Sequence, residues 1–252
     1  MRDYIKQPLE VLSYGGGTQS TAMLILIKQG KLPKPDLVLH ADTGSEMPET
    51  IEFLEIAEKI CNEINVPFKV VTSHKGALHD DYMRLKAIPI IGVRSCTANF
   101  KILPQRRYLR SIVGKGKGKV LANMWLGITT DEARRRVEKS DVIWTGLKYP
   151  LLDVYPLTRK EAIKINEDAG LKVGKSGCFC CPYAGSAHWH SLKDNHPELF
   201  AIAIEMETIK ENFRGKGRGL QRKGKLSDLL NQTSILDWVE DSSCDTGGGC
   251  FL

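Results

Sequence analysis

Apolar residues along this chain fall into short runs that alternate with amphipathic segments. The run 9–14 predicts a buried strand, and residues 21–27 predict a helix directly after it. A second apolar run, 37–39, precedes an amphipathic segment that reaches Ile64. Because strands that alternate with helices favour parallel pairing, the pattern predicts a doubly wound, Rossmann-like, mostly parallel α/β sheet.

The C-terminal part of the chain is expected to add helices to this sheet. Thr158 and Glu161 have the spacing of a capping box before an apolar stretch, and Gly170 would close that helix. Pro197 would open a further helix that reaches about Asn212. With 252 residues, the chain is long enough for one nucleotide-binding α/β domain and an appendage. We expect the first over residues 1–175 and a cysteine-rich helical region over 176–252.

Three consecutive glycines, Gly15–Gly17, lie between the first predicted strand and the first predicted helix. Glycines let the backbone approach a ligand closely, and the N–H groups at a helix N-terminus favour an anion. An ordinary tight turn is the alternative interpretation. The Lys of a Walker-type loop and the spaced glycines of a dinucleotide turn are both lacking, so neither of those phosphate loops is indicated.

The sequence 15–20 resembles the PP-loop of the adenine nucleotide α-hydrolase superfamily, a Ser-Gly-Gly-x-Asp-Ser element after the first strand. Gly15 stands in place of the first Ser and Gln19 in place of the Asp, which removes a carboxylate. The resemblance implies ATP or a related adenine nucleotide as ligand, with Mg²⁺ as a companion ion. It assigns nucleotide binding to Ser13, Tyr14, Gly15, Gly16, Gly17, Thr18, Gln19 and Ser20.

Within that superfamily, the chain is similar to the phosphoadenosine phosphosulfate (PAPS) reductase family. The segment 40–50 contains the Asp-Thr-Gly and Pro-Glu-Thr elements that follow the second strand in that family. Asp42 and Thr43 would then lie at the carboxyl end of a parallel strand, where open sheets bind ligands; a capping loop without a ligand is the alternative. The segment 125–136 resembles the family's later strand-turn, which adds Gly127 and Arg134 as nucleotide-binding candidates, although Thr129 stands where an Arg is usual.

Six of the seven cysteines fall into groups that suggest metal or redox chemistry. Cys61 lies in an amphipathic helix, where we expect it to belong to the core. Iron–sulfur enzymes of the same family bind a [4Fe–4S] cluster through an upstream pair and a Cys-x-x-Cys about eighty residues later, and here Cys96 lies 82 residues before Cys178. Ser95 replaces the other upstream cysteine. The resemblance implies Cys96, Cys178 and Cys181 as ligands, with Cys244 as the fourth and Cys180 next, and zinc is the alternative metal.

The formal net charge of +6 is unevenly distributed. The glycine-rich segments 114–119 and 214–225 together carry nine Lys and Arg residues and no acidic residue. Segments of this kind can follow a nucleic-acid backbone, although neither contains an aromatic residue for base stacking, and a solvated surface loop is the alternative.

Two enzyme classes and one binding class fit these features. The first is nucleotide-dependent sulfur transfer, in which adenylation releases pyrophosphate before thiolation of a nucleic acid, with a sulfur-donor protein as a further partner. The second is a PAPS or adenylyl-sulfate reductase, whose catalytic thiol would be supplied here by Cys250 near the C-terminus. The third is a non-catalytic nucleotide-binding module with structural zinc. We expect a cytoplasmic protein, because the sequence contains no signal peptide and no membrane-spanning stretch.

Overall fold

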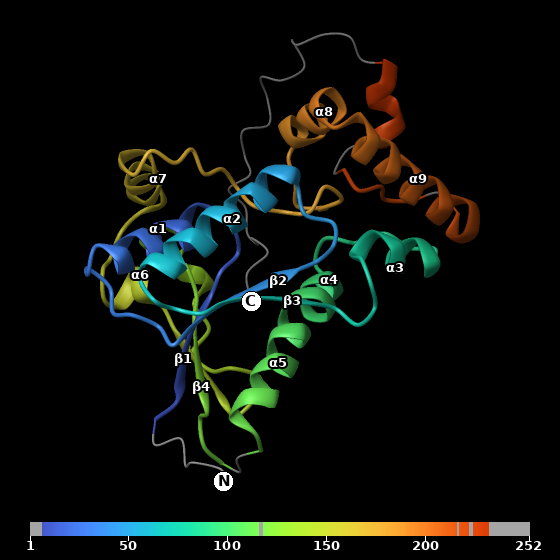
Figure 1. The fold of residues 1–252 in the computed structure, drawn as a ribbon. Helices are drawn as coiled ribbons and strands as arrows, with labels where there is room; N and C mark the ends of the chain where they lie inside the picture. The colour runs from blue at the N-terminus through green and yellow to red at the C-terminus, as the bar shows by residue number, and fades with distance from the viewer. Residues whose placement is uncertain (1–6, 116–117, 216, 222–223, 232–252) are drawn as a thin grey trace.

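The computed structural model describes residues 7–115, 118–215, 217–221 and 224–231. Its centre is a sheet of five strands, β1 (Leu9–Ser13), β2 (Leu37–Asp42), β3 (Phe68–Thr72), β4 (Ala122–Trp125) and β5 (Thr145–Lys148) (Figure 1). The strand order is β3-β2-β1-β4-β5, and every neighbouring pair is parallel. The Rossmann-like α/β fold expected from the sequence is therefore confirmed.

The strand order reverses between β1 and β4, because the chain runs outward from β1 to β3 and then returns to the other side of β1. Ligands of open parallel sheets bind beside such a reversal, at the carboxyl ends of the strands. The segments that follow β1, β2 and β4 therefore meet at one edge. These are the segments that carry Gly15–Gly17, Asp42 and Thr43, and Gly127.

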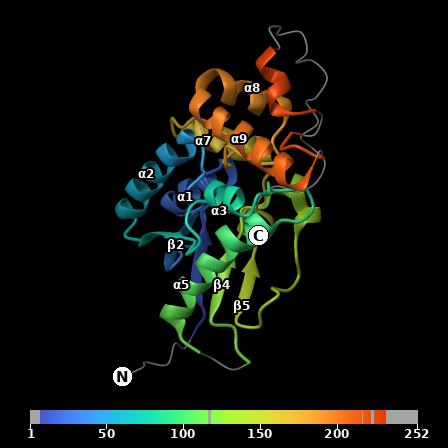
Figure 2. The same cartoon turned by 90° about the vertical axis from the view of Figure 1, so that its right-hand side faces the viewer.

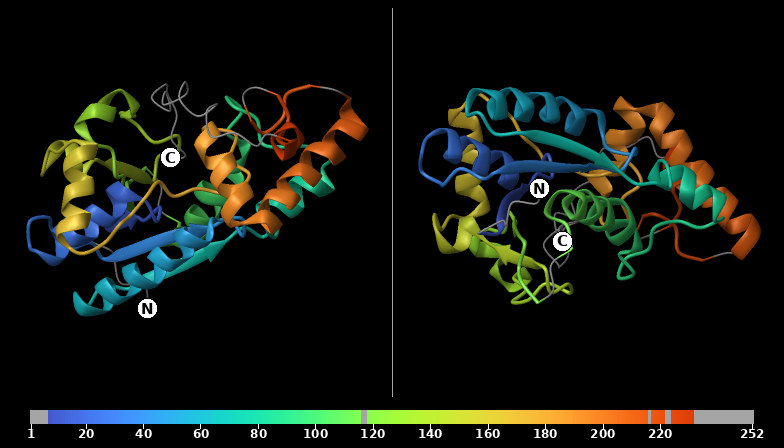
Figure 3. Two further views of the ribbon diagram at one scale, coloured as in Figure 1. Left: turned by 90° about the horizontal axis from the view of Figure 1, so that it is seen from above. Right: turned by 60° about the horizontal axis from the view of Figure 1, so that its bottom comes forward.

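Helices cover both faces of the sheet (Figure 3). On one face, α1 (Thr18–Lys28) packs against α2 (Pro48–Glu63) and α7 (Arg159–Asp168), with the short α6 (Pro150–Asp153) before α7. Since α1 is buried over nearly its whole length, its apolar residues surround the helix instead of forming one stripe. On the other face, α5 (Leu103–Val113) contacts β2 and β3.

A helical lobe lies beyond the carboxyl ends of the strands (Figure 2). It contains α3 (Leu78–Arg84), α8 (Ser186–Asn195), α9 (Pro197–Arg214) and the 3₁₀ segment η3 (Leu226–Asn231). Trp189, Phe200 and Met206 form its core together with Leu78 and Phe100. The core of the lobe thus takes residues from before position 176, and the division at residue 175 stays a prediction.

Three shorter elements lie between β3 and β5. A single turn, α4 (Ser95–Thr97), leads directly into the π-helical segment η1 (Ala98–Ile102), and the 3₁₀ segment η2 (Thr130–Arg135) follows β4. π-Helical turns are rare and are often found at functional sites. In the described part of the chain, no helix is long and apolar enough to cross a membrane.

Two local predictions at helix ends are confirmed. The Thr158 hydroxyl accepts a hydrogen bond from the Glu161 N–H, and the Glu161 carboxylate accepts one from the Thr158 N–H, so α7 begins with a capping box. The helix opened by Pro197 runs to Arg214, two residues beyond the expected end.

The buried amide of Asn166 joins α7 to the start of α1, because its Nδ2 donates a hydrogen bond of 3.0 Å to the Thr18 carbonyl. We expect Asn166→Ala to lower the free energy of unfolding by about 1–3 kcal/mol, since the Thr18 carbonyl loses a buried donor. The measurement is urea unfolding followed by circular dichroism. Asn195→Ala removes an exposed amide from α8 and should change stability by less than about 0.5 kcal/mol. Equal losses in the two variants would contradict this role of Asn166.

Candidate functional site

The glycine turn between β1 and α1 is held by the hydroxyl of Ser20. Ser20 Oγ accepts hydrogen bonds of 3.3 Å from the N–H groups of Gly15 and Gly17, and it donates one of 3.0 Å to the Gly17 carbonyl. Gly16 has a φ of +73°, a conformation that other residues rarely adopt. The loop therefore directs backbone N–H groups toward one oxygen atom at the N-terminus of a buried helix, as an anion site requires.

Three chain segments close around this loop. A Cβ atom on Gly16 would lie 2.8 Å from Thr50 Cγ2, and one on Gly17 would lie 2.8 Å from Ser176 Oγ. A Cβ on Gly127 would lie 3.1 Å from Gln19 Cβ. These glycines are needed by the packing of the protein itself, so a larger side chain at Gly16 would disturb the fold as well as any bound guest.

The other predicted nucleotide-binding residues lie in different environments, and several of their side chains contact the protein itself. The Tyr14 ring is buried in the core, and its hydroxyl contacts Thr21 Oγ1 and the Phe53 carbonyl. Gln19 Nε2 donates to Glu132 Oε2, and Thr18 Oγ1 donates to the Val173 carbonyl. Tyr14, Thr18 and Gln19 thus each have a protein partner.

Ser13 and Arg134 have other surroundings. Ser13 lines a cavity of about 320 Å³ between α5 and strands β4 and β5, where its hydroxyl contacts Gln105. Arg134 is exposed on η2. The assignment of both residues to nucleotide binding stays a prediction.

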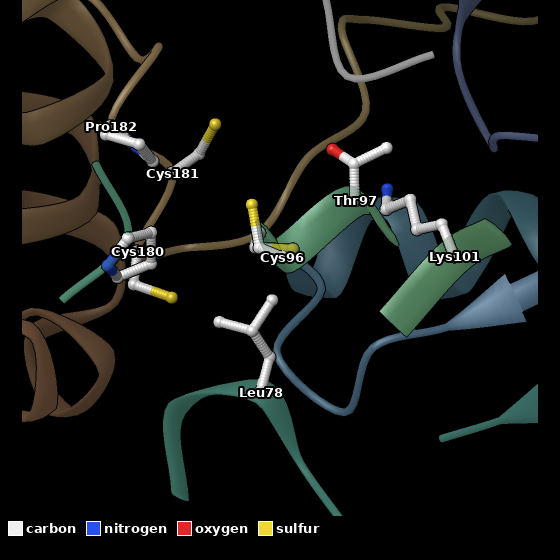
Figure 4. Close-up of a pocket in the computed structure, with 9 residues that line it drawn as sticks. Leu78, Cys96, Thr97, Lys101, Cys180, Cys181 and Pro182 are labelled. Carbon is white, nitrogen blue, oxygen red and sulfur yellow. The ribbon is translucent and has the colours of Figure 1, made fainter. Parts of the chain in front are cut away.

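Four cysteines line one pocket of the structure (Figure 4). Cys96 comes from α4, and the others come from the segment 178–182, so residues more than eighty positions apart meet here. We call this site the cysteine pocket; it is lined by Leu78, Pro89, Cys96, Thr97, Lys101, Cys178, Cys180, Cys181 and Pro182. All three ligands predicted within the described residues are present, and Cys180 lies beside them.

Backbone pairing holds the cysteine segment against the loop that follows β2. Glu46 and Cys178 form an antiparallel bridge, the Phe179 N–H donates to the Ser45 carbonyl, and the Met47 N–H donates to the Gly177 carbonyl. The loop after β2 is thereby fixed to the C-terminal region of the chain. As a result, the cysteine pocket lies at the same edge of the sheet as the glycine turn.

A buried polar group joins the end of β2 to the cysteine pocket. Thr43 Oγ1 lies 3.1 Å from Glu46 Oε1 and 3.2 Å from Cys178 Sγ. Lys101 Nζ, on the π-helical segment, lies 3.5 Å from the same Glu46 oxygen. The other carboxylate oxygen, Glu46 Oε2, is buried without a hydrogen-bond partner in the described part of the chain. The side chain of Thr43 is therefore directed toward the cysteines, whereas Asp42 Oδ1 accepts a hydrogen bond from the Gly44 N–H.

His40, on β2, lies near the same group. Its Nδ1 is 2.9 Å from the Tyr14 carbonyl, directly before the glycine turn, and its Nε2 is buried without a partner among the described residues. Burial lowers the pKa of His40, although the Glu46 carboxylate acts in the opposite direction. The buried polar side chains thus extend from the cysteine pocket to the backbone that precedes Gly15.

Burial affects the thiol pKa values of two cysteines in different parts of the protein. Burial raises the pKa of the Cys178 thiol well above its ordinary value, and the neighbouring Glu46 carboxylate raises it further. Burial likewise raises the pKa of Cys61, a core residue of α2, to about 12. Cys61 belongs to the core, as the sequence indicated.

The donor chemistry of the cysteine pocket fits a group held by thiolates, such as an iron–sulfur cluster or zinc. Within the described residues, however, no three or more His, Cys, Asp or Glu side chains are arranged as a metal site. The pocket brings the donors together without directing them to a common point. The predicted fourth ligand, Cys244, and the predicted nucleophile, Cys250, lie outside the described residues.

The comparison with protein families decides the classification. The phosphoadenosine phosphosulfate reductase domain matches residues 10–167, which include β2 to β5, all of β1 except Leu9, the glycine turn and Cys96. The chain belongs to this family. It is thus a member of an enzyme family, and the resemblance stated from the motifs is confirmed.

Individual relatives are more distant. An uncharacterized protein of Methanocaldococcus jannaschii is 26% identical over 196 residues, which are 75% of this chain and 45% of that protein. The chain thus spans less than half the length of this curated relative.

Two solved structures are similar to this chain at low sequence identity. A phosphoadenylyl-sulfate reductase from Candida auris in complex with phosphate is 10% identical, with a TM-score of 0.47 over 68% of this chain and 77% of that one. The U34-tRNA thiolase NcsA from Methanococcus maripaludis, with its [4Fe–4S] cluster, is 18% identical, with a TM-score of 0.41 over 84% of this chain and 75% of that one.

Sequence reasoning missed Glu46 and Ser176 as parts of the site. Glu46 lies inside the Asp-Thr-Gly segment, but a carboxylate in a polar loop gives no sign that it will be buried. Ser176 lies two residues before Cys178, and its contact with Gly17 follows from the backbone pairing at Cys178. The sequence indicated a role for these two residues only through their closeness to a motif, the Asp-Thr-Gly segment for Glu46 and the cysteine segment for Ser176.

The ion pair of Glu46 with Lys101 provides a test of this geometry, because the Glu46 side chain is only 1% exposed. We expect Lys101→Ala to lower the free energy of unfolding by about 3 kcal/mol, since it leaves a carboxylate buried without its cation. Adding Glu46→Gln should recover at least half of the loss. Both values come from urea unfolding.

A control for this experiment is Lys28→Ala, which removes one partner of the exposed pair Lys28–Glu63 and should cost less than about 1 kcal/mol. Strictly additive effects of Lys101→Ala and Glu46→Gln would show that the two side chains do not interact.

Proposed function

We propose that this protein is a PP-loop enzyme that transfers sulfur to a nucleic acid in a nucleotide-dependent reaction. The observation that carries the proposal is the meeting of Cys96 with Cys178, Cys180 and Cys181 in one pocket at the carboxyl edge of the sheet. Because Thr43 lies within 3.2 Å of Cys178 Sγ, the pocket is joined to the predicted nucleotide-binding edge by direct contact. Thiols at a nucleotide edge are suited to reactions that exchange oxygen for sulfur.

The reaction would begin with ATP at the glycine turn. The N–H groups of Gly15 and Gly17, now directed at Ser20 Oγ, would donate to the phosphates. A carbonyl oxygen of the acceptor base attacks the α-phosphorus, and pyrophosphate leaves. A sulfur nucleophile from the donor then attacks the activated carbon, and AMP departs with the original oxygen.

Gln19 affects how the nucleotide is held. It occupies the position of a carboxylate in related loops, yet in this protein its side-chain amide donates to Oε2 of Glu132. Glu132 lies on η2, where its Oε1 pairs with Arg135. Glu132 thus provides a carboxylate near the loop from another segment. We propose that Glu132 takes part in holding the Mg²⁺ that accompanies ATP.

The cysteine pocket would hold an iron–sulfur cluster through Cys96, Cys178 and Cys181, with Cys180 or Cys244 as a further thiolate and zinc as the alternative metal. If only three protein thiolates held it, such a cluster would supply an iron that can bind sulfur. Burial and Glu46 raise the pKa of the Cys178 thiol, so the bound metal itself would have to stabilise the thiolate. Lys101 acts in the favourable direction, because its cation lowers the pKa of this thiol and pairs with Glu46.

Release of sulfite from an adenylyl sulfate is the second candidate function, and the family match favours it. That reaction needs a thiolate nucleophile, for which Cys250 is the candidate. The two functions differ in their nucleotide: sulfur transfer consumes ATP and releases pyrophosphate, whereas the reductase consumes a sulfated nucleotide. A direct assay of each product separates them.

The proposal is tested on full-length protein purified without oxygen. We expect iron, acid-labile sulfide and visible absorption, all strongly reduced in Cys96→Ser, Cys178→Ser and Cys181→Ser. Cys61→Ala, which alters a core thiol away from the pocket, should keep its full iron content. The wild-type protein should exchange pyrophosphate into ATP, with a higher rate when a nucleic acid is added.

Colourless protein that holds zinc and no iron would contradict the cluster. Sulfite release from a sulfated adenine nucleotide, together with no exchange of pyrophosphate into ATP, would overturn sulfur transfer in favour of the reductase.

A further inference from the structure

A groove of about 240 Å³ lies beside the cysteine pocket. We call it the basic groove; it is lined by Ile90, Ile91, Pro182, Arg218, Gly219, Leu220 and Gln221. Pro182 lines both sites, and Pro89 of the cysteine pocket is the direct neighbour of Ile90 in the groove. A ligand in the groove would therefore end next to the thiols.

One wall of the groove is fixed by a buried carboxylate of α9. Glu207 Oε1 accepts a hydrogen bond of 2.5 Å from the Leu220 N–H, and Glu207 Oε2 accepts one of 2.9 Å from the Leu226 N–H. Leu220 is itself buried, in the core of the helical lobe. The described part of the segment 214–225 is thus attached to the protein at defined points, which distinguishes this wall from a solvated loop.

Charge favours an anionic ligand in the groove. Arg218 is exposed on this wall, and within the described residues no ion pair of Arg218 is found. Two other cations of the described segment have partners, since Lys225 pairs with Glu211 and Arg214 donates to the carbonyls of Leu85 and Lys86. Arg218 is thus the cation of the groove lining that can meet a phosphate group.

The residues next to Ile91 and Pro182 in the chain offer surfaces for a base at the margin of the groove. Ile90 lines the groove and is 46% exposed. The Arg94 guanidinium lies over the Tyr183 ring at 6.0 Å, and the Gly92 N–H donates to the Tyr183 hydroxyl. Guanidinium planes and aromatic rings are the groups on which unpaired bases stack.

The second basic segment cannot belong to this surface. Its described residues, 114–115 and 118–119, follow α5 and precede β4, so they lie at the amino ends of the parallel strands, away from the helical lobe (Figure 1). The described residues of the two basic segments are therefore at opposite ends of the sheet. Of these, Arg218 lines the groove beside the thiols.

We propose that the basic groove binds a single-stranded nucleic acid and directs one of its bases to the cysteine pocket. Arg218 holds a backbone phosphate, and the Arg94–Tyr183 pair stacks a flanking base. This inference rests on the proposed sulfur transfer, because it specifies where the acceptor of that reaction binds. A duplex does not fit the same role, since its bases are paired and cannot stack on side chains.

The test measures binding of short labelled oligonucleotides to the full-length protein by fluorescence anisotropy at several salt concentrations. We expect Arg218→Ala to weaken binding about fivefold and to reduce the slope of log affinity against log salt by about 0.7, the value for one phosphate contact on a single strand. Arg94→Gly, which suits the left-handed backbone of this residue, should weaken binding about tenfold through lost stacking. Lys119→Ala, at the other end of the molecule, is the matched control and should leave affinity within about twofold.

Single strands of RNA and DNA with the same sequence identify which polymer is preferred, and a duplex arm tests the need for unpaired bases. Stronger binding of the duplex, equal losses in Arg218→Ala and Lys119→Ala, or no binding by the wild type would each overturn the groove. Pyrophosphate exchange without nucleic acid is measured on the same preparations. If pyrophosphate exchange and iron content are retained while oligonucleotide binding fails, the proposed binding groove is refuted and the proposed reaction is not. If oligonucleotides bind as expected while pyrophosphate exchange and iron are absent, the proposed reaction is refuted and the binding groove is not.

Discussion

The pairing of residues 45–47 with residues 177–179 is the contact on which the arrangement of the site depends. Two backbone hydrogen bonds and the bridge between Glu46 and Cys178 bring the C-terminal cysteines to the end of β2. Without this pairing, the glycine turn and the thiols would belong to separate parts of the chain. With it, the helical lobe shares one edge with the sheet, and a reaction that needs both a nucleotide and a thiol has a single location.

The same pairing buries charge that the fold must accommodate. Glu46 is enclosed beside Cys178, and Lys101 on a π-helical turn provides the opposite charge. A buried ion pair of this kind seldom adds net stability, because desolvation opposes the attraction of the two charges. Its presence next to a raised-pKa thiol is more easily explained by the chemistry of the pocket than by stability. Glu46 Oε2 and His40 Nε2, which have no hydrogen-bond partner among the described residues, lead to the same conclusion.

Features that depend on neighbouring residues in the sequence were predictable, whereas features that depend on tertiary contacts were not. The strand before Gly15, the parallel sheet and the capping box at Thr158 follow from apolar periodicity and known helix-end chemistry. The gathering of Cys96 with Cys178 was inferred from a family resemblance, and no local pattern would have given it. The inward direction of the Tyr14 ring depends on the packing of β1 against α1 and α2. The separation of the two basic segments follows from the parallel sheet, since residues before a strand and residues beyond its end lie at opposite edges.

The central claim is that the glycine turn and the cysteine pocket form one site, and a crystal structure tests it most directly. The crystals are grown without oxygen from full-length protein with a non-hydrolysable ATP analogue, and iron is located by its anomalous scattering. We predict that the phosphates accept hydrogen bonds from the N–H groups of Gly15 and Gly17 and that iron lies among Cys96, Cys178 and Cys181 of the same molecule. An analogue bound instead in the cavity between α5 and β5, or iron found away from these three cysteines, would contradict the account.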